Sequence, residues 1–141
     1  MNSFEIKHAV MSYFRFTRQC LCASECLNND VMIITKGGIT IDVEIKINKY
    51  DLWKGEARKL KHRGYKSKYF NTDYYANKFY ICVPTNLLDE AEKWVKTTNN
   101  KYGIIECKNI VNVTILKKAS LLHKVKSEYL AHKIMMRVCS E

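Results

Sequence analysis

The stretch DVMIITKGGITIDVEIK (residues 30–46) decides the fold, because it contains two apolar runs separated by Gly37 and Gly38. Its second run alternates isoleucine or valine with polar residues, which is typical of a strand with one buried face. The pattern predicts an antiparallel hairpin that turns at the two glycines. Such a hairpin brings Asp30, Glu44 and Lys46 to the same end of the sheet.

The register of this hairpin decides whether the three charged side chains meet. A strict two-residue turn would pair Asp30 with Ile45 and point Asp30 away from Glu44 and Lys46. A three-residue loop containing glycine, or one β-bulge, shifts the pairing by one residue and places all three side chains on one face. We predict the shifted register, because the alternation leaves only the polar face for Glu44 and Lys46.

The rest of the chain alternates between helical and strand patterns. Helical spacing is expected over residues 3–16, 51–65, 86–97 and 119–138, and strands over residues 18–25 and 78–84 and in a second hairpin at 102–118. The order α-β-β-β-α-β-α-β-β-α predicts an α/β (α+β) fold, a mixed central β-sheet with flanking helices and a parallel crossover after the third strand. We expect a single domain over residues 1–141, with a C-terminal helix from about residue 119.

The charge balance indicates a polyanionic partner. The chain carries 24 Lys and Arg against 14 Asp and Glu, a net charge of +10. Such an excess attracts phosphate backbones and favours nucleic acid, whereas a membrane-surface protein would usually show a basic amphipathic helix with exposed bulky apolar residues. No apolar run reaches membrane-span length, and the six cysteines lie mostly in apolar runs typical of reduced thiols. We therefore expect a cytoplasmic protein.

Two carboxylates that converge at the end of a hairpin repel each other unless a cation lies between them. Mg²⁺ or Mn²⁺ prefers such hard oxygen ligands and completes its coordination with water and phosphate oxygens. Lys46 would then hold or deprotonate an attacking water beside Asp30 and Glu44. The alternative is a structural ion pair in which Lys46 only neutralises Glu44.

At these residues the chain resembles a known family. A helix, a short strand ending in Glu25, Asp30 at the start of a strand, and VEIK followed by NKYDLWKGEARKLKH are similar to the core of the PD-(D/E)XK nuclease superfamily, in particular its compact MmcB-like DNA-repair and phage-encoded members. The resemblance covers most of residues 3–124 and implies a restriction-endonuclease-like α-β-β-β-α-β core. It also implies that Asp30, Glu44 and Lys46 are catalytic, with Asp30, Glu44 and Glu25 as metal ligands. Asn29 stands where the fuller motif has proline, and the segment from residue 124 onward has no counterpart.

The surroundings of these residues offer contacts for a bound strand. A basic helix after the hairpin places a set of cationic side chains where they would grip phosphates: Lys54, Arg58, Lys59, Lys61, His62 and Arg63. A solvated basic face is the alternative. The aromatic residues of the following loop would stack on unpaired bases or anchor the loop: Tyr65, Tyr69, Phe70, Tyr74 and Tyr75.

The sequence therefore predicts a metal-dependent nuclease that hydrolyses DNA phosphodiesters in repair, recombination or phage DNA metabolism, with RNA as a further substrate of the same chemistry. A non-catalytic nucleic-acid-binding accessory protein on the same fold is the alternative. A basic protein that binds other proteins is a third reading, and it predicts partner binding that is insensitive to salt. The C-terminal helix is compatible with a monomer and with a homodimer.

Overall fold

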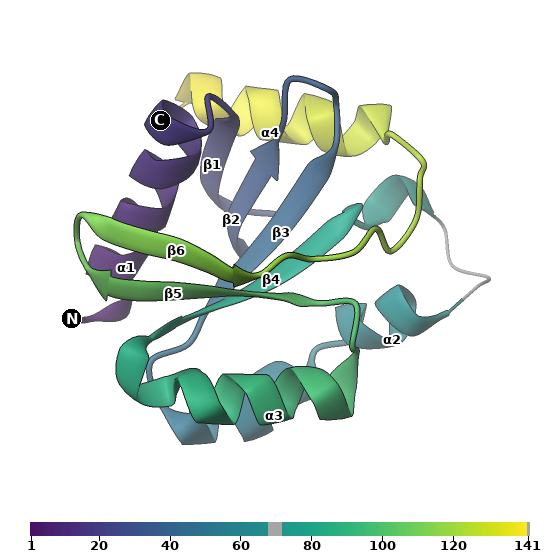
Figure 1. The fold of residues 1–141 in the computed structure, drawn as a ribbon. Coiled ribbons are helices and arrows are strands. Elements are labelled where there is room, and N and C mark those ends of the chain that lie inside the picture. The colour runs from purple at the N-terminus through teal and green to yellow at the C-terminus, as the bar shows by residue number, and fades with distance from the viewer. Residues whose placement is uncertain (68–71, 141) are drawn as a thin grey trace.

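A six-stranded mixed sheet forms the centre of the molecule (Figure 1). The computed structural model describes residues 1–67 and 72–140. The strands are β1 (Leu21–Cys26), β2 (Asn29–Ile34), β3 (Thr40–Ile45), β4 (Lys78–Pro84), β5 (Gly103–Asn109) and β6 (Asn112–Lys117), and they lie in this order across the sheet. β3 runs parallel to β4 and β4 to β5, whereas the other neighbours are antiparallel. The predicted fold class is confirmed, including the parallel crossover after β3.

Helices cover both faces of this sheet. They are α1 (Ser3–Ser12), α2 (Lys61–Lys66), α3 (Leu88–Thr98) and α4 (Glu128–Ser140), with shorter helical turns at Tyr13–Thr17, Asp51–Gly55, Glu56–Arg58, Thr72–Tyr74 and Thr85–Leu87. α1 packs on one face, and α2, α3 and α4 pack on the other, with α4 against β1 and β2. Among the described residues, no helix combines the length and the apolar composition needed to cross a bilayer.

The central strand β3 is buried on both faces. Ile41, Val43 and Ile45 point into the core beneath α1, whereas Asp42 and Glu44 point to the opposite face. Every residue of β3 is buried, because the strand lies between β2 and β4 and has helices on both sides. The polar face that the sequence suggests is therefore an interior face, and its charges must be compensated inside the protein.

The single helix expected over residues 51–65 is wrong. The chain instead passes through two short helical turns, adopts an extended conformation at Lys59 (ψ 130°) and only then enters α2. Residues five apart in a continuous α-helix point about 140° away from each other. The break allows Glu56 and Lys61 to reach the same group of side chains below β3.

The C-terminal helix also begins later than expected, at Glu128 rather than near residue 119. The preceding segment is held in a non-helical conformation by Asn77, whose Nδ2 donates to the carbonyl oxygens of His123 (3.0 Å) and Val125 (2.8 Å). Ser127 then caps the helix, since its Oγ accepts a hydrogen bond from the Leu130 N–H at 3.1 Å. Tertiary hydrogen bonds therefore outweigh the helical spacing of residues 119–127.

Candidate active site

The pairing of β2 with β3 sets the position of the predicted site. Val31 lies opposite Val43, and Ile34 lies opposite Thr40, around a loop in which Gly38 has a positive φ of 85°. This is the shifted register predicted from the sequence. Continued by one residue, it places Asp30 opposite Glu44.

Asp30 is tied to the main chain between Glu44 and Lys46. Its Oδ2 accepts a hydrogen bond from the Ile45 N–H at 2.8 Å. The side chain also lines a cavity of about 290 Å³ together with Glu25, Lys46 and other residues. Asp30 and Lys46 therefore border one solvent-accessible space at the end of β3.

Glu44 lies in the protein interior and is not among the residues that line this cavity. Its side chain is 0% exposed, and its two oxygens pair with the ammonium groups of Lys61 and of Lys59, the latter at 3.1 Å. The carboxylate is thus enclosed by two lysines from the segment that crosses beneath β3.

Lys46 reaches the same interior group of charges. Its Nζ lies 3.2 Å from Oε1 of Glu56, which also lies 3.0 Å from Nζ of Lys59. Glu56 is fully buried. Because Glu56 holds the ammonium group, the orientation of Lys46 depends on a residue from outside the hairpin.

Asp42 completes the arrangement. Its Oδ2 pairs with Lys61 at 3.0 Å and accepts a hydrogen bond from the Tyr65 hydroxyl at 2.8 Å. We call this group the carboxylate–lysine cluster, and it consists of Asp42, Glu44, Glu56, Lys46, Lys59 and Lys61. Sequence reasoning missed Asp42 and Glu56. Asp42 could have been found, since it lies two residues before Glu44 and therefore on the same face of β3.

The cluster shifts the ionisation of its members in opposite directions. Burial and the repulsion of Asp42 raise the pKa of Glu44 to about 8, and the attraction of Lys61 offsets only part of this rise. Burial alone would also raise the pKa of Glu56, but the hydrogen bond to His62 and the charges of Lys61 and Lys59 outweigh it and lower the pKa. Asp30 adds to the repulsion at Glu44, so the two predicted ligands interact electrostatically.

The carboxylates at this site are of the type that binds a hard cation, one that takes only one or two of its ligands from the protein. Oδ1 of Asp42 is buried and accepts no hydrogen bond, whereas Oε2 of Glu44 and Oε1 of Glu56 lie against lysine ammonium groups at 3.0–3.2 Å. Within residues 1–67 and 72–140, no three His, Cys, Asp or Glu side chains converge to hold a metal by themselves. Mg²⁺ needs only one or two carboxylates when water and phosphate oxygens fill its other positions. Asp30 and Glu44 are carboxylates of this kind, and in the structure Lys59 and Lys61 supply the positive charge beside Glu44.

Glu25 lines the same cavity as Asp30, but its carboxylate forms an ion pair with a residue of another element. Its carboxylate pairs with Lys7 of α1, and its side chain is 56% exposed. The backbone at Glu25 has a positive φ of 50°, at the end of β1. The structure thus brings Glu25 to the site without directing it at Glu44.

The basic segment that was predicted to grip phosphates divides into two parts. Lys54, Arg58 and Arg63 are exposed and remain available for such contacts. Lys59 and Lys61 instead pair with the buried carboxylates of the carboxylate–lysine cluster. The basic helix expected here is interrupted at Lys59, and this break turns two lysines inward.

His62 is a core residue, so its predicted phosphate contact is wrong. Its Nδ1 lies 2.6 Å from the Tyr102 hydroxyl, and its Nε2 lies 2.7 Å from Oε2 of Glu56. The imidazole packs edge-on against Phe79 and Trp94 and is 5% exposed. Basic residues surround His62 in the sequence, and this pattern favoured a surface position over a core position.

The aromatic residues also differ in their environments. Tyr65 is buried and bonded to Asp42, so it cannot stack on a base. Tyr74 and Tyr75 line an open cavity of about 430 Å³ that also contacts Lys59 and Lys61. Tyr69 and Phe70 lie outside the described residues.

Comparisons with known proteins define the fold class. No family model matches the chain, and no curated protein matches it. The chain is similar in structure to the SPO1766 protein of unknown function from Silicibacter pomeroyi, with a TM-score of 0.70 and 14% identity over 99% of this chain and 85% of that one. At this identity the likeness establishes a shared mixed α/β fold and no activity.

Proposed function

We propose that the protein is a metal-dependent nuclease of the PD-(D/E)XK type that hydrolyses phosphodiester bonds in DNA. One observation carries the proposal: the β2–β3 register, continued by one residue, places Asp30 opposite Glu44, and Asp30 accepts a hydrogen bond from the N–H of Ile45, the residue between Glu44 and Lys46. The order α1-β1-β2-β3-α2-β4 agrees with the core that the sequence resemblance implies. The net charge of +10 supports a nucleic-acid substrate.

The roles of the residues follow from their positions. Asp30 and Glu44 would hold Mg²⁺ or Mn²⁺, which when bound neutralises phosphate charge and makes a water molecule more acidic. Lys46 borders the cavity, where its ammonium group would hold the attacking water and stabilise charge on the phosphate. Glu56 is a positioning residue, because it lies 3.2 Å from Nζ of Lys46 and fixes the direction of that side chain.

Lys59 and Lys61 would have to yield when a metal binds. Both ammonium groups contact the Glu44 carboxyl group in the structure, and a divalent cation there would compete with them. Lys59 is 36% exposed and lies in the extended break between two helical turns, so it can leave without unfolding a helix. Once released, both lysines would lie beside the cavity that Tyr74 and Tyr75 line, where a strand could pass.

The test is cleavage of labelled single-stranded, duplex and forked DNA, with and without Mg²⁺ or Mn²⁺. Glu44→Gln and Lys46→Ala should each reduce cleavage by roughly 100-fold or more. Lys49→Ala is the matched control, since it removes an exposed lysine that follows the same strand and pairs with Glu90. Cleavage that needs no metal, or that survives in both site variants, would refute the proposal.

A specific observation also favours a second candidate, a non-catalytic nucleic-acid-binding protein on this fold. Glu44 is 0% exposed and is already contacted by two lysines, as in a purely structural cluster of charged side chains. Under this reading no substrate is cut, and salt-sensitive DNA binding is undiminished in Glu44→Gln and Lys46→Ala. The same panel therefore distinguishes the two functions.

A further inference from the structure

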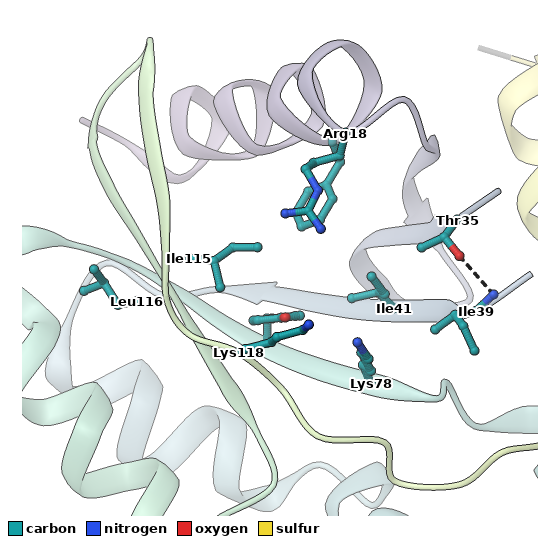
Figure 2. Close-up of a pocket in the computed structure, with 10 residues that line it drawn as sticks. Arg18, Thr35, Ile39, Ile41, Lys78, Ile115, Leu116 and Lys118 are labelled. Carbon is teal, nitrogen blue, oxygen red and sulfur yellow. Dashed lines mark hydrogen bonds between the residues drawn. The ribbon is translucent and has the colours of Figure 1, made fainter. Parts of the chain in front are cut away.

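A second, basic pocket lies on the α1 face of the sheet, at the other end of β3 (Figure 2). It has a volume of about 510 Å³. Arg18, which follows α1, faces Lys78 at the start of β4 and Lys118 after β6 across this space. Ile41 in this pocket and Ile45 beside Asp30 are four residues apart along β3, or about 13 Å, so the two sites are separate.

Among the described residues, the three cations of the basic pocket have no acidic partner. Within residues 1–67 and 72–140, none of the three forms an ion pair with a carboxylate. The lining contains no Asp or Glu, and Arg18 donates one long hydrogen bond, 3.4 Å, to the Tyr13 hydroxyl. Burial and the charges of Lys118 and Arg18 lower the pKa of Lys78. Like charges that face one space repel each other, and a bound anion would relieve this repulsion.

The remaining walls of the pocket are apolar or can donate hydrogen bonds. Phe14, Ile41 and Ile115 provide an apolar surface beside the cations. The Tyr80 hydroxyl accepts a hydrogen bond from the Ala119 N–H at 3.1 Å, which leaves its own proton for a ligand. The volume lies within the range of about 300–1,000 Å³ that is usual for small-molecule sites. A suitable ligand therefore has an anionic end and a flat or apolar body.

We propose that the basic pocket binds the phosphomonoester group of a nucleotide, either free or at the end of a nucleic-acid strand. A phosphomonoester carries a charge of about −1.5 to −2 at neutral pH, which compensates three cations better than a single carboxylate or an internal phosphodiester does. The planar guanidinium of Arg18 can bind two phosphate oxygens at once, and the lysines act as point charges. The base would lie against Ile41 and Ile115. This site does not depend on the nuclease activity proposed above.

Equilibrium binding tests the proposal with four probes: inorganic phosphate, deoxyadenosine 5′-monophosphate, deoxyadenosine, and one oligonucleotide with and without a 5′-phosphate. Lys78→Gln and Lys118→Gln should each weaken binding of the nucleotide about tenfold or more. Lys108→Gln is the charge-matched control, because Lys108 is an exposed lysine of β5 that does not line the pocket. Thermal unfolding of each variant establishes that it is folded.

The proposal predicts that the nucleotide binds more tightly than inorganic phosphate and that deoxyadenosine binds much more weakly. Tighter binding of the free nucleotide identifies a metabolite as the ligand, whereas a preference for the phosphorylated oligonucleotide over the unphosphorylated one identifies a strand end. Equal binding of deoxyadenosine and its monophosphate would overturn the proposal. So would an equal loss of affinity in Lys108→Gln, or the failure of both the nucleotide and the phosphorylated strand to bind.

Discussion

Replacing Glu44 by glutamine should change how stability depends on pH. Burial and Asp42 raise the pKa of Glu44 from its ordinary 4.5 to about 8. Between these two values the folded protein holds a proton that the unfolded chain has lost. The free energy of unfolding therefore falls as the pH rises from about 4.5 to 8, and this contribution levels off above pH 8. Glutamine has no such proton, so the variant should lose this part of the pH dependence.

The size of the effect follows from the pKa. The pKa rises by about 3.5, and one pKa unit corresponds to about 1.4 kcal/mol, so an isolated group would contribute about 5 kcal/mol. This is an upper limit, because Lys59 and Lys61 and entering water can adjust as Glu44 ionises. We expect a difference of about 2 kcal/mol between pH 5 and pH 9. For a domain of this size that corresponds to roughly 4–8 °C in Tm.

The assay is chemical unfolding at pH 5, 7 and 9 without divalent metal, comparing the wild type with Glu44→Gln. Glu106→Gln is the matched control, since Glu106 is a buried glutamate on β5 that lies outside the carboxylate–lysine cluster and accepts a 2.7 Å hydrogen bond from Thr85. The control should keep the fall in stability that Glu44 causes between pH 5 and pH 9. If Glu44→Gln and the wild type change in parallel over this range, the reasoning about Glu44 is refuted.

Three further predictions concern other parts of the molecule. His62→Ala should destabilise the fold by about 3 kcal/mol, because it removes a buried ring and leaves the Tyr102 hydroxyl without its 2.6 Å partner. Urea unfolding measures this, and a loss below about 1 kcal/mol would contradict the prediction. Gly38→Ala should lower the free energy of unfolding by about 1 kcal/mol, because φ is 85° there, whereas Gly37→Ala should be nearly neutral. Equal effects of the two substitutions would contradict a turn with a positive φ at Gly38. Arg58→Ala should lower the slope of log K against log salt for DNA binding by about one, and an unchanged slope would remove Arg58 from the interface.

Much of the fold could be predicted, because it is specified by local patterns. Alternation along residues 39–47 and the two glycines were sufficient to predict the hairpin and its register, as the pairing of Val31 with Val43 confirms. The order of helices and strands followed from hydrophobic periodicity in the same way. The late start of α4 could not be predicted, because Asn77, some 50 residues earlier in the chain, holds the preceding segment.

The candidate site was only partly predictable, for a physical reason. A strand of the form TIDVEIK looks the same whether its polar face meets water or a covered interior, so the burial of Asp42 and Glu44 depends on helices that the local pattern does not place. The inward turn of Lys59 and Lys61 depends on the break in the helix, and the contact of Glu56 with Lys46 joins residues ten positions apart. Long-range compensation of charge is therefore the part of the site that sequence reasoning missed.

The most direct test of the central claim is to measure Mn²⁺ binding and Mn²⁺-dependent DNA cleavage on the same preparations of wild type, Glu44→Gln and Lys46→Ala. If Glu44 holds the metal and Lys46 acts on the water, Glu44→Gln should lose both properties, whereas Lys46→Ala should bind Mn²⁺ and fail to cleave. If Mn²⁺ binds Glu44→Gln as tightly as the wild type, or Lys46→Ala cleaves at the wild-type rate, the account of this site is contradicted.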